Sequence, residues 1–161
     1  MMHLARRLLG YLALTGFVVS LGAHAWTALG NDVASQIPQI WLLHVGMFVV
    51  FVPLVFFSRY DLGSEPREAT WTSGLPGWVK TLGLCILAYA ALNFLLVLGH
   101  TGGGSPVLRE GKFVLLNHGK VVREITKIEY AALTAAQVRG FSGLWLVFYF
   151  WPAAYFLLRK A

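Results

Sequence analysis

The chain has 161 residues, of which 57% are hydrophobic and only 12% are charged, and its mean hydropathy is +0.65. Soluble domains carry about 25% charged residues, so this composition excludes an ordinary water-soluble domain. The net charge of +6 does not predict nucleic-acid binding, because basic residues of apolar chains gather at lipid headgroups. The single cysteine, Cys85, excludes an intrachain disulfide and a cysteine-based metal cluster.

Four long and almost uncharged runs dominate the chain, at about residues 8–29, 37–57, 78–99 and 141–158. Each is close to the ~20 residues with which a helix crosses ~30 Å of hydrocarbon. The runs do not alternate with period two, which favours helices over the strands of a membrane barrel. The sequence therefore predicts an all-α membrane protein, a single domain over residues 1–161 with four transmembrane helices.

The flanks of the first run predict its orientation. With both termini in the cytoplasm, seven basic residues lie inside and six outside, nearly a tie under the positive-inside rule. We favour this orientation because the first helix usually dominates and its far flank, residues 30–36, contains no lysine or arginine. Ala23-His24-Ala25 resembles the cleavage site of a secretory signal, but the apolar run continues through Leu29, so we expect the helix to be kept.

The first two connections predict how the helices are arranged. The first is short, so the first two helices should form an antiparallel pair. On the first helix, Gly16 and Ser20 form a small-x-x-x-small surface that another helix can approach closely. The second connection, residues 58–77, mixes Asp61 and Glu65 with glycines and prolines, and we expect a solvated loop.

Residues 101–140 form the largest polar segment and predict a small extramembrane insert between helices three and four. The β-rich runs 112–117 and 120–125 flank His118-Gly119 and predict a β-hairpin, and Glu110-Gly111 could form a second turn after a short strand. Thr126 and Glu129 fit a capping box that begins an amphipathic helix over 127–139. Gly140 and Gly143 should break this helix before the last span.

The last third of the chain contains the segments Gly111-Lys112-Phe113-Val114-Leu115, His118-Gly119, Val122-Arg123-Glu124-Ile125, Glu129-Tyr130 and Arg139-Gly140-Phe141-Ser142-Gly143. In these segments it resembles an uncharacterised family of small bacterial multi-pass (four-helix) inner-membrane proteins. The rest of the chain is similar only in hydropathy. The resemblance implies a location in the bacterial inner membrane, and it implies no activity.

Polar residues inside the apolar runs are the candidate binding residues, because such groups are costly in lipid and tend to face the bundle interior. His24, His44 and Asn93 lie at matching depths, and Tyr89, Asn93 and His100 share one helix face. If the faces converge, the imidazoles could bind haem or a transition metal, or relay protons. The alternative is that these side chains are structural and hydrogen-bond between helices.

No motif assigns an activity. No HExxH is present, and no helix carries two metal ligands three or four residues apart, so we expect no catalytic residue and leave the cofactor unknown. We expect an accessory or scaffolding component of a membrane assembly. One alternative is a haem- or metal-binding redox module that uses His24, His44 and His100. A small transport component is the other.

The insert carries the predicted contact surface for partners. Its basic residues are expected to contact anionic lipid or an acidic partner, unless they form only a solvated rim: Lys112, Lys120, Arg123 and Lys127. The expected partners are the lipid bilayer and another membrane protein or a second copy of the chain, with no nucleic acid.

Overall fold

The structure is a computed structural model that describes residues 2–63, 70–102 and 104–159, and His100 by its backbone only. Its elements, in chain order, are α1 (Met2–Ala28), α2 (Val33–Gln36), the 3-10 turn η1 (Pro38–Trp41), α3 (Leu42–Leu62), α4 (Gly77–Thr101), β1 (Ser105–Arg109), β2 (Lys112–Asn117), β3 (Lys120–Glu124) and α5 (Lys127–Leu158). The described residues include four helices that are long and apolar enough to cross a membrane, as predicted.

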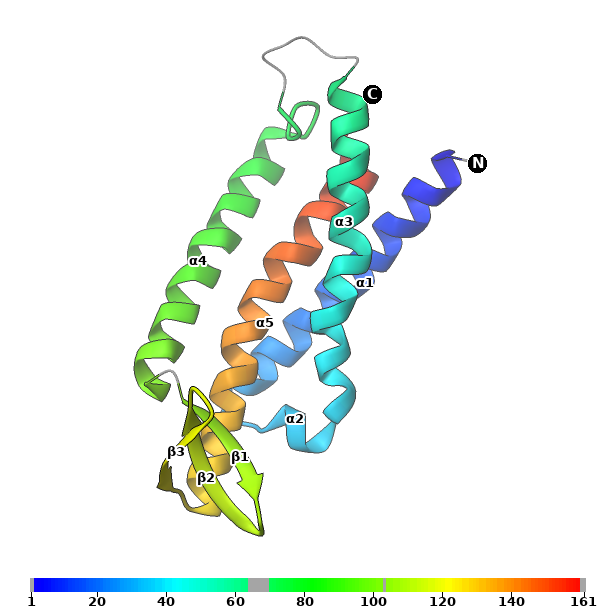
Figure 1. Ribbon diagram of the computed structural model, residues 1–161. Helices are drawn as coiled ribbons and strands as arrows, with labels where there is room; N and C mark the ends of the chain where they lie inside the picture. The colour runs from blue at the N-terminus through cyan, green and yellow to red at the C-terminus, as the bar shows by residue number, and fades with distance from the viewer. Residues whose placement is uncertain (1, 64–69, 103, 160–161) are drawn as a thin grey trace.

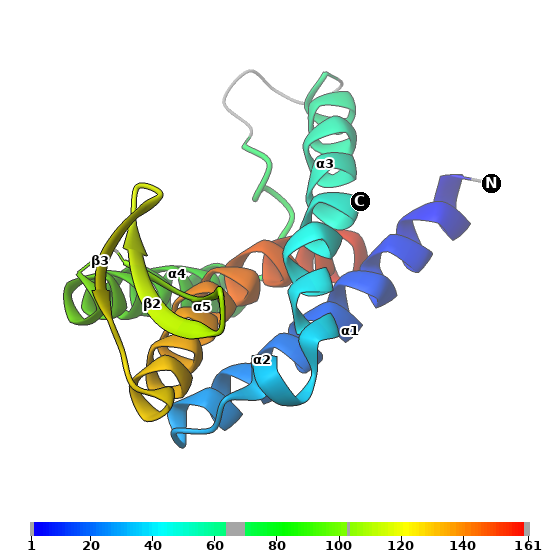
Figure 2. The ribbon, with the colours of Figure 1, turned by 60° about the horizontal axis from the view of Figure 1, so that its bottom comes forward.

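Helix α5 is the centre of the bundle (Figures 1 and 2). α1, α3 and α4 all pack against it, and most contacts between helices involve α5. The start of α1, the end of α3 and the end of α5 lie at one end of the bundle, whereas α2 and the sheet lie at the other (Figure 1). Side chains from three helices therefore meet at each end.

Small residues allow α1 to approach α5 closely. The buried face of α1 carries Gly10, Ala13, Gly16, Ser20 and Ala23 at intervals of three or four residues. A methyl group added at Gly16 would overlap the ring of Tyr149 on α5. The predicted small-x-x-x-small surface of α1 is thus the surface that packs against α5.

The predicted break between an amphipathic helix and the last span is wrong, because α5 runs without interruption from Lys127 to Leu158. The capping box of Thr126 and Glu129 is present at its start. Gly140 and Gly143 lie inside α5, where added methyl groups would be crowded by Val97 and Asn93 of α4. These glycines permit close helix packing, a use that sequence alone does not distinguish from a helix break.

The predicted hairpin is confirmed and extended to a three-stranded antiparallel sheet in the order β1-β2-β3. Both predicted turns are present, at Glu110-Gly111 and His118-Gly119. All four turn residues have positive φ, between 49° and 79°, as in type I′ hairpin turns. The ring centroids of Phe113 in β2 and Tyr130 in α5 are 4.9 Å apart, so the sheet rests on the first turns of α5.

The second connection differs from its prediction. α3 continues to Leu62, so Asp61 lies in a helix and not in a solvated loop. Glu65 and the rest of residues 64–69 lie outside the described residues. In the first connection, the side chain of Asp32 caps the one-turn helix α2 by accepting a hydrogen bond from the amide of Ser35.

The packing of α1 can be tested by matched substitutions on this helix. We expect Gly16→Ala to destabilise the protein by about 1–3 kcal/mol, because the new methyl group overlaps Tyr149. Gly22→Ala is the control, since a Cβ there meets nothing within 4 Å. Unfolding in detergent, followed by circular dichroism, measures both variants. Equal stability of the two variants would contradict the packing described here.

Candidate functional site

A chain of buried and partly buried hydrogen bonds joins α4, α1 and α5. His24 Nδ1 lies 2.8 Å from the hydroxyl oxygen of Ser142, and His24 Nε2 lies 2.5 Å from that of Tyr89. The Ser142 hydroxyl also donates to the carbonyl of Arg139, at 3.1 Å, so its oxygen accepts from His24 Nδ1. With the Ser142 proton used in this way, a neutral imidazole carries its proton on Nδ1 and accepts from Tyr89 at Nε2.

Asn93 extends this arrangement on α4. Its Nδ2 donates to the carbonyl of Arg139 at 3.0 Å, and its Oδ1 accepts from Nε of Arg139 at 3.2 Å. Asn93 is buried, with 3% of its surface exposed, so its amide spans the close contact between α4 and α5. We refer to Tyr89, His24, Ser142, Arg139 and Asn93 as the His24 chain.

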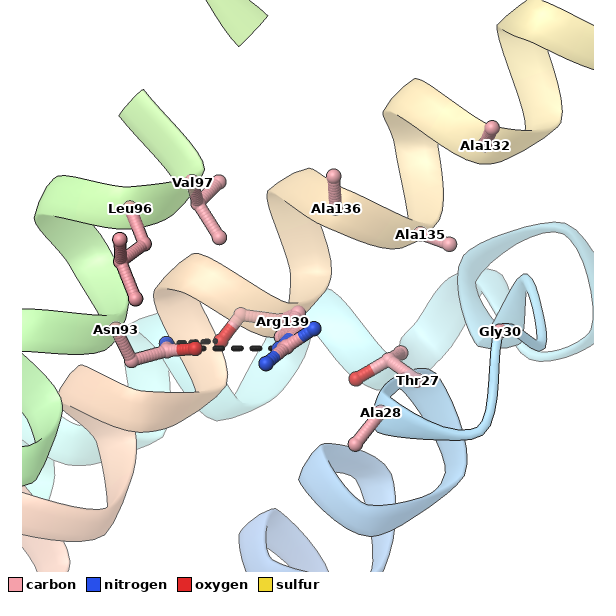
Figure 3. Close-up of a pocket in the computed structure, with 10 residues that line it drawn as sticks. All are labelled: Thr27, Ala28, Gly30, Asn93, Leu96, Val97, Ala132, Ala135, Ala136 and Arg139. Carbon is pink, nitrogen blue, oxygen red and sulfur yellow. Dashed lines mark hydrogen bonds between the residues drawn. The ribbon is translucent and has the colours of Figure 1, made fainter. Parts of the chain in front are cut away.

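The His24 chain borders a pocket of about 440 Å³ (Figure 3). Its wall on α5 consists of Ala132, Ala135, Ala136 and Arg139, and further lining residues come from α4 and from the end of α1. Figure 3 shows the Arg139 guanidinium lying between Asn93 of α4 and Thr27 of α1. A cation thus lies at the junction of three helices, in a pocket whose other lining side chains are mostly small or apolar.

The second predicted histidine makes a different contact. Nδ1 of His44 accepts a hydrogen bond of 3.1 Å from the indole of Trp145, and the His44 ring packs edge-on against Phe141. Of the four polar residues predicted to cluster with His100, the structure joins His24 to Tyr89, whereas His44 and Asn93 have other partners. The side chain of His100 lies outside the described residues.

This geometry does not favour a metal or haem at the histidines. Both ring nitrogens of His24 and Nδ1 of His44 already have hydrogen-bond partners. Within residues 2–63, 70–102 and 104–159, no three histidine, cysteine, aspartate or glutamate side chains lie close enough together to hold a metal ion. Hydrogen bonds between helices are what the structural alternative predicts, and cofactor binding by His24, His44 and His100 stays a prediction.

A second polar cluster lies at the other end of the bundle, and the sequence analysis missed it. Asp61 of α3 accepts two hydrogen bonds from Arg6 of α1, at 2.7 and 3.0 Å, and one of 2.6 Å from Arg159. Tyr155 of α5 also donates to Asp61. The three charged side chains are only 12–23% exposed. We refer to Arg6, Asp61, Tyr155 and Arg159 as the Asp61 network.

Two of the four basic residues predicted as a contact surface form ion pairs with glutamates of the chain. Lys112 pairs with Glu124 at 2.5 Å, and this hydrogen bond raises the pKa of the Lys112 ammonium. Arg123 pairs with Glu129 at 2.9 Å. Lys120 begins β3 and Lys127 begins α5, and both residues are exposed. The proposed contact with lipid or an acidic partner remains a prediction for this surface.

Comparison with known proteins adds no relative: no protein-family model, no curated protein and no solved structure matches the chain. The functional argument therefore depends on the residues and contacts of this chain.

The hydrogen bond between α4 and α1 can be tested with a single hydroxyl deletion. We expect Tyr89→Phe to destabilise the fold by about 0.5–2 kcal/mol, because Nε2 of His24 loses its donor. Tyr11→Phe is the matched control, since Tyr11 lies on α1 and is 60% exposed. Unfolding in detergent measures both variants. If the Tyr89→Phe variant were as stable as the Tyr11→Phe control, the hydrogen bond between Tyr89 and His24 would not stabilise the bundle.

Proposed function

We propose that this chain is an integral membrane protein whose four long helices cross the bilayer. The observation that carries the proposal is the spacing of the two polar clusters. Arg6 and His24 are 18 residues apart on α1, which is about 27 Å of helix, and Arg139 and Tyr155 are 16 apart on α5, about 24 Å. These separations approach the ~30 Å hydrocarbon thickness of a bilayer.

Composition between the two clusters supports the same proposal. The stretches 8–31, 42–58, 81–99 and 140–158 contain no lysine, arginine, aspartate or glutamate. Large apolar side chains on these stretches face outward in each of α1, α3 and α4, among them Leu8, Val18, Phe48, Phe56, Leu84 and Leu95, all at least half exposed. An exposed apolar surface of this extent is stable against lipid and unstable against water.

We further propose that both termini lie in the cytoplasm, that the sheet lies outside, and that the membrane is the bacterial inner membrane. The absence of basic residues at positions 30–36 and the presence of Arg6 and Arg7 before the first span support this orientation. The order of the elements then places both ends of the chain on one side, since four spans return it to the side from which it starts.

For the biochemical role, we propose an accessory or scaffolding component of a membrane assembly. The polar side chains of the His24 chain bind mainly to one another and so stabilise the bundle. The exposed strand β3 offers a contact surface on which Val121 and Val122 are 50% and 58% exposed. A bundle whose polar groups are hydrogen-bonded to one another, and whose exposed strand carries two exposed valines, suits binding better than catalysis.

Insertion and orientation are tested by cysteine labelling in a Cys85→Ala background. In intact bacterial cells with a permeabilised outer membrane, we expect a membrane-impermeant maleimide to label Lys120→Cys at the start of β3. Arg59→Cys, at the opposite end of the bundle, should react only after the inner membrane is lysed. If only Arg59→Cys were labelled in intact cells, the orientation would be the opposite of the one proposed. Recovery of the protein in the aqueous fraction, without label, would refute insertion.

The accessory role is tested by photo-crosslinking in growing cells. A small photo-reactive amino acid at Val122 on β3 or at Phe56 on α3 should give an adduct of discrete mass, because both side chains are exposed, by 58% and 70%. Val50 is the control, since it is fully buried and should give no adduct between chains. Failure to obtain an adduct from either exposed position would contradict the accessory role.

A further inference from the structure

The guanidinium of Arg139 has unused hydrogen-bond donors. An arginine side chain carries five N–H donors, and the one on Nε is occupied by Asn93 Oδ1 at 3.2 Å. In the part of the chain that the structure describes, no carboxylate forms an ion pair with Arg139. The side chain is exposed within the pocket of Figure 3, so its terminal nitrogens are available to a ligand.

The other polar side chains of the pocket are already engaged. Nδ2 of Asn93 donates to the carbonyl of Arg139, and the hydroxyl of Thr27 donates to carbonyls within α1. The lining residues include no acidic side chain. The pocket therefore combines one positive charge with apolar and small side chains, which is a chemistry that favours an anion.

The position of the pocket indicates which anion. Leu96, which lines the pocket, is 63% exposed on α4, and Leu92 one turn deeper in the span is 59% exposed. The pocket thus opens beside an apolar helix surface that continues toward the middle of the bundle. A phosphate bound at Arg139 could extend an attached acyl chain along this surface, whereas a free anion would leave the surface unused.

We propose that the Arg139 pocket binds the phosphate headgroup of an anionic membrane lipid. A guanidinium forms paired hydrogen bonds with two phosphate oxygens, and Asn93 holds Nε so that the terminal nitrogens face the pocket. Arg139 directly precedes the uncharged stretch 140–158, so the proposed insertion puts it at the polar boundary of the last span. This inference rests on the proposed membrane insertion.

Native mass spectrometry of the full chain in detergent tests the proposal, with phosphatidylglycerol and phosphatidylcholine added in equal amounts. We expect the wild-type chain to retain phosphatidylglycerol preferentially. Arg139→Gln should reduce this preference roughly tenfold, the loss expected for a charged hydrogen-bonded pair. Arg109→Gln is the matched control, because it removes the same charge from β1, outside the pocket, and should leave the preference unchanged.

A second variant separates binding from folding. Ala132→Leu keeps every charge and fills the pocket from an exposed position, so it should also lower the preference while circular dichroism remains that of the wild type. The proposal is overturned if Arg139→Gln retains the preference or if the wild type has none. Displacement of the lipid by inorganic phosphate at equal concentration would also overturn it, in favour of a free-anion site.

The two proposals fail in different ways. A chain that shows the expected cysteine labelling but no lipid preference overturns the lipid site and leaves membrane insertion standing. A chain recovered in the aqueous fraction overturns both.

Discussion

The bundle depends on close packing against one helix, α5. Because α1, α3 and α4 mostly contact α5 and not one another, the fold tolerates little change in the distance between α5 and its neighbours. Gly16 of α1 and Gly143 of α5 set that distance, since a methyl group at either would collide with the facing helix. In the proposed membrane-inserted state, apolar side chains gain nothing by leaving the hydrocarbon, so such packing and interhelical hydrogen bonds are the forces that hold the helices together.

The two polar clusters depend on this spacing. The hydrogen bonds from Asn93 to Arg139 and from His24 to Ser142 require helix backbones that approach closely. At the opposite end, Asp61 neutralises one of the two arginines that approach it, and its carboxylate binds side chains from α1 and α5. A buried carboxylate left without its arginines would be costly, so these contacts specify which helices are neighbours.

Much of the fold follows from local sequence, whereas the sites do not. Apolar runs predict the four helices, and Glu110-Gly111 and His118-Gly119 predict the turns of the sheet, because both signals are contained in a few adjacent residues. A glycine in the sequence can indicate either a helix end or a close helix contact. The low helix propensity of glycine predicts a helix end at Gly140, whereas in the structure Gly140 lies within α5 and allows close packing against Val97. In the Asp61 network, Asp61 is 55 positions from Arg6 and 98 positions from Arg159 along the chain. The residues next to Asp61 in the sequence therefore do not indicate which side chains it binds.

The central position of α5 also constrains how the bundle is assembled during synthesis. α5 follows the other three long helices in the chain, so they leave the ribosome before the helix that they pack against. Until α5 is synthesised, the small-residue face of α1 lacks the helix that it packs against, and the imidazole of His24 lacks its serine partner. The first three long helices therefore cannot complete the bundle by themselves, and the arrival of α5 is the step that makes it compact.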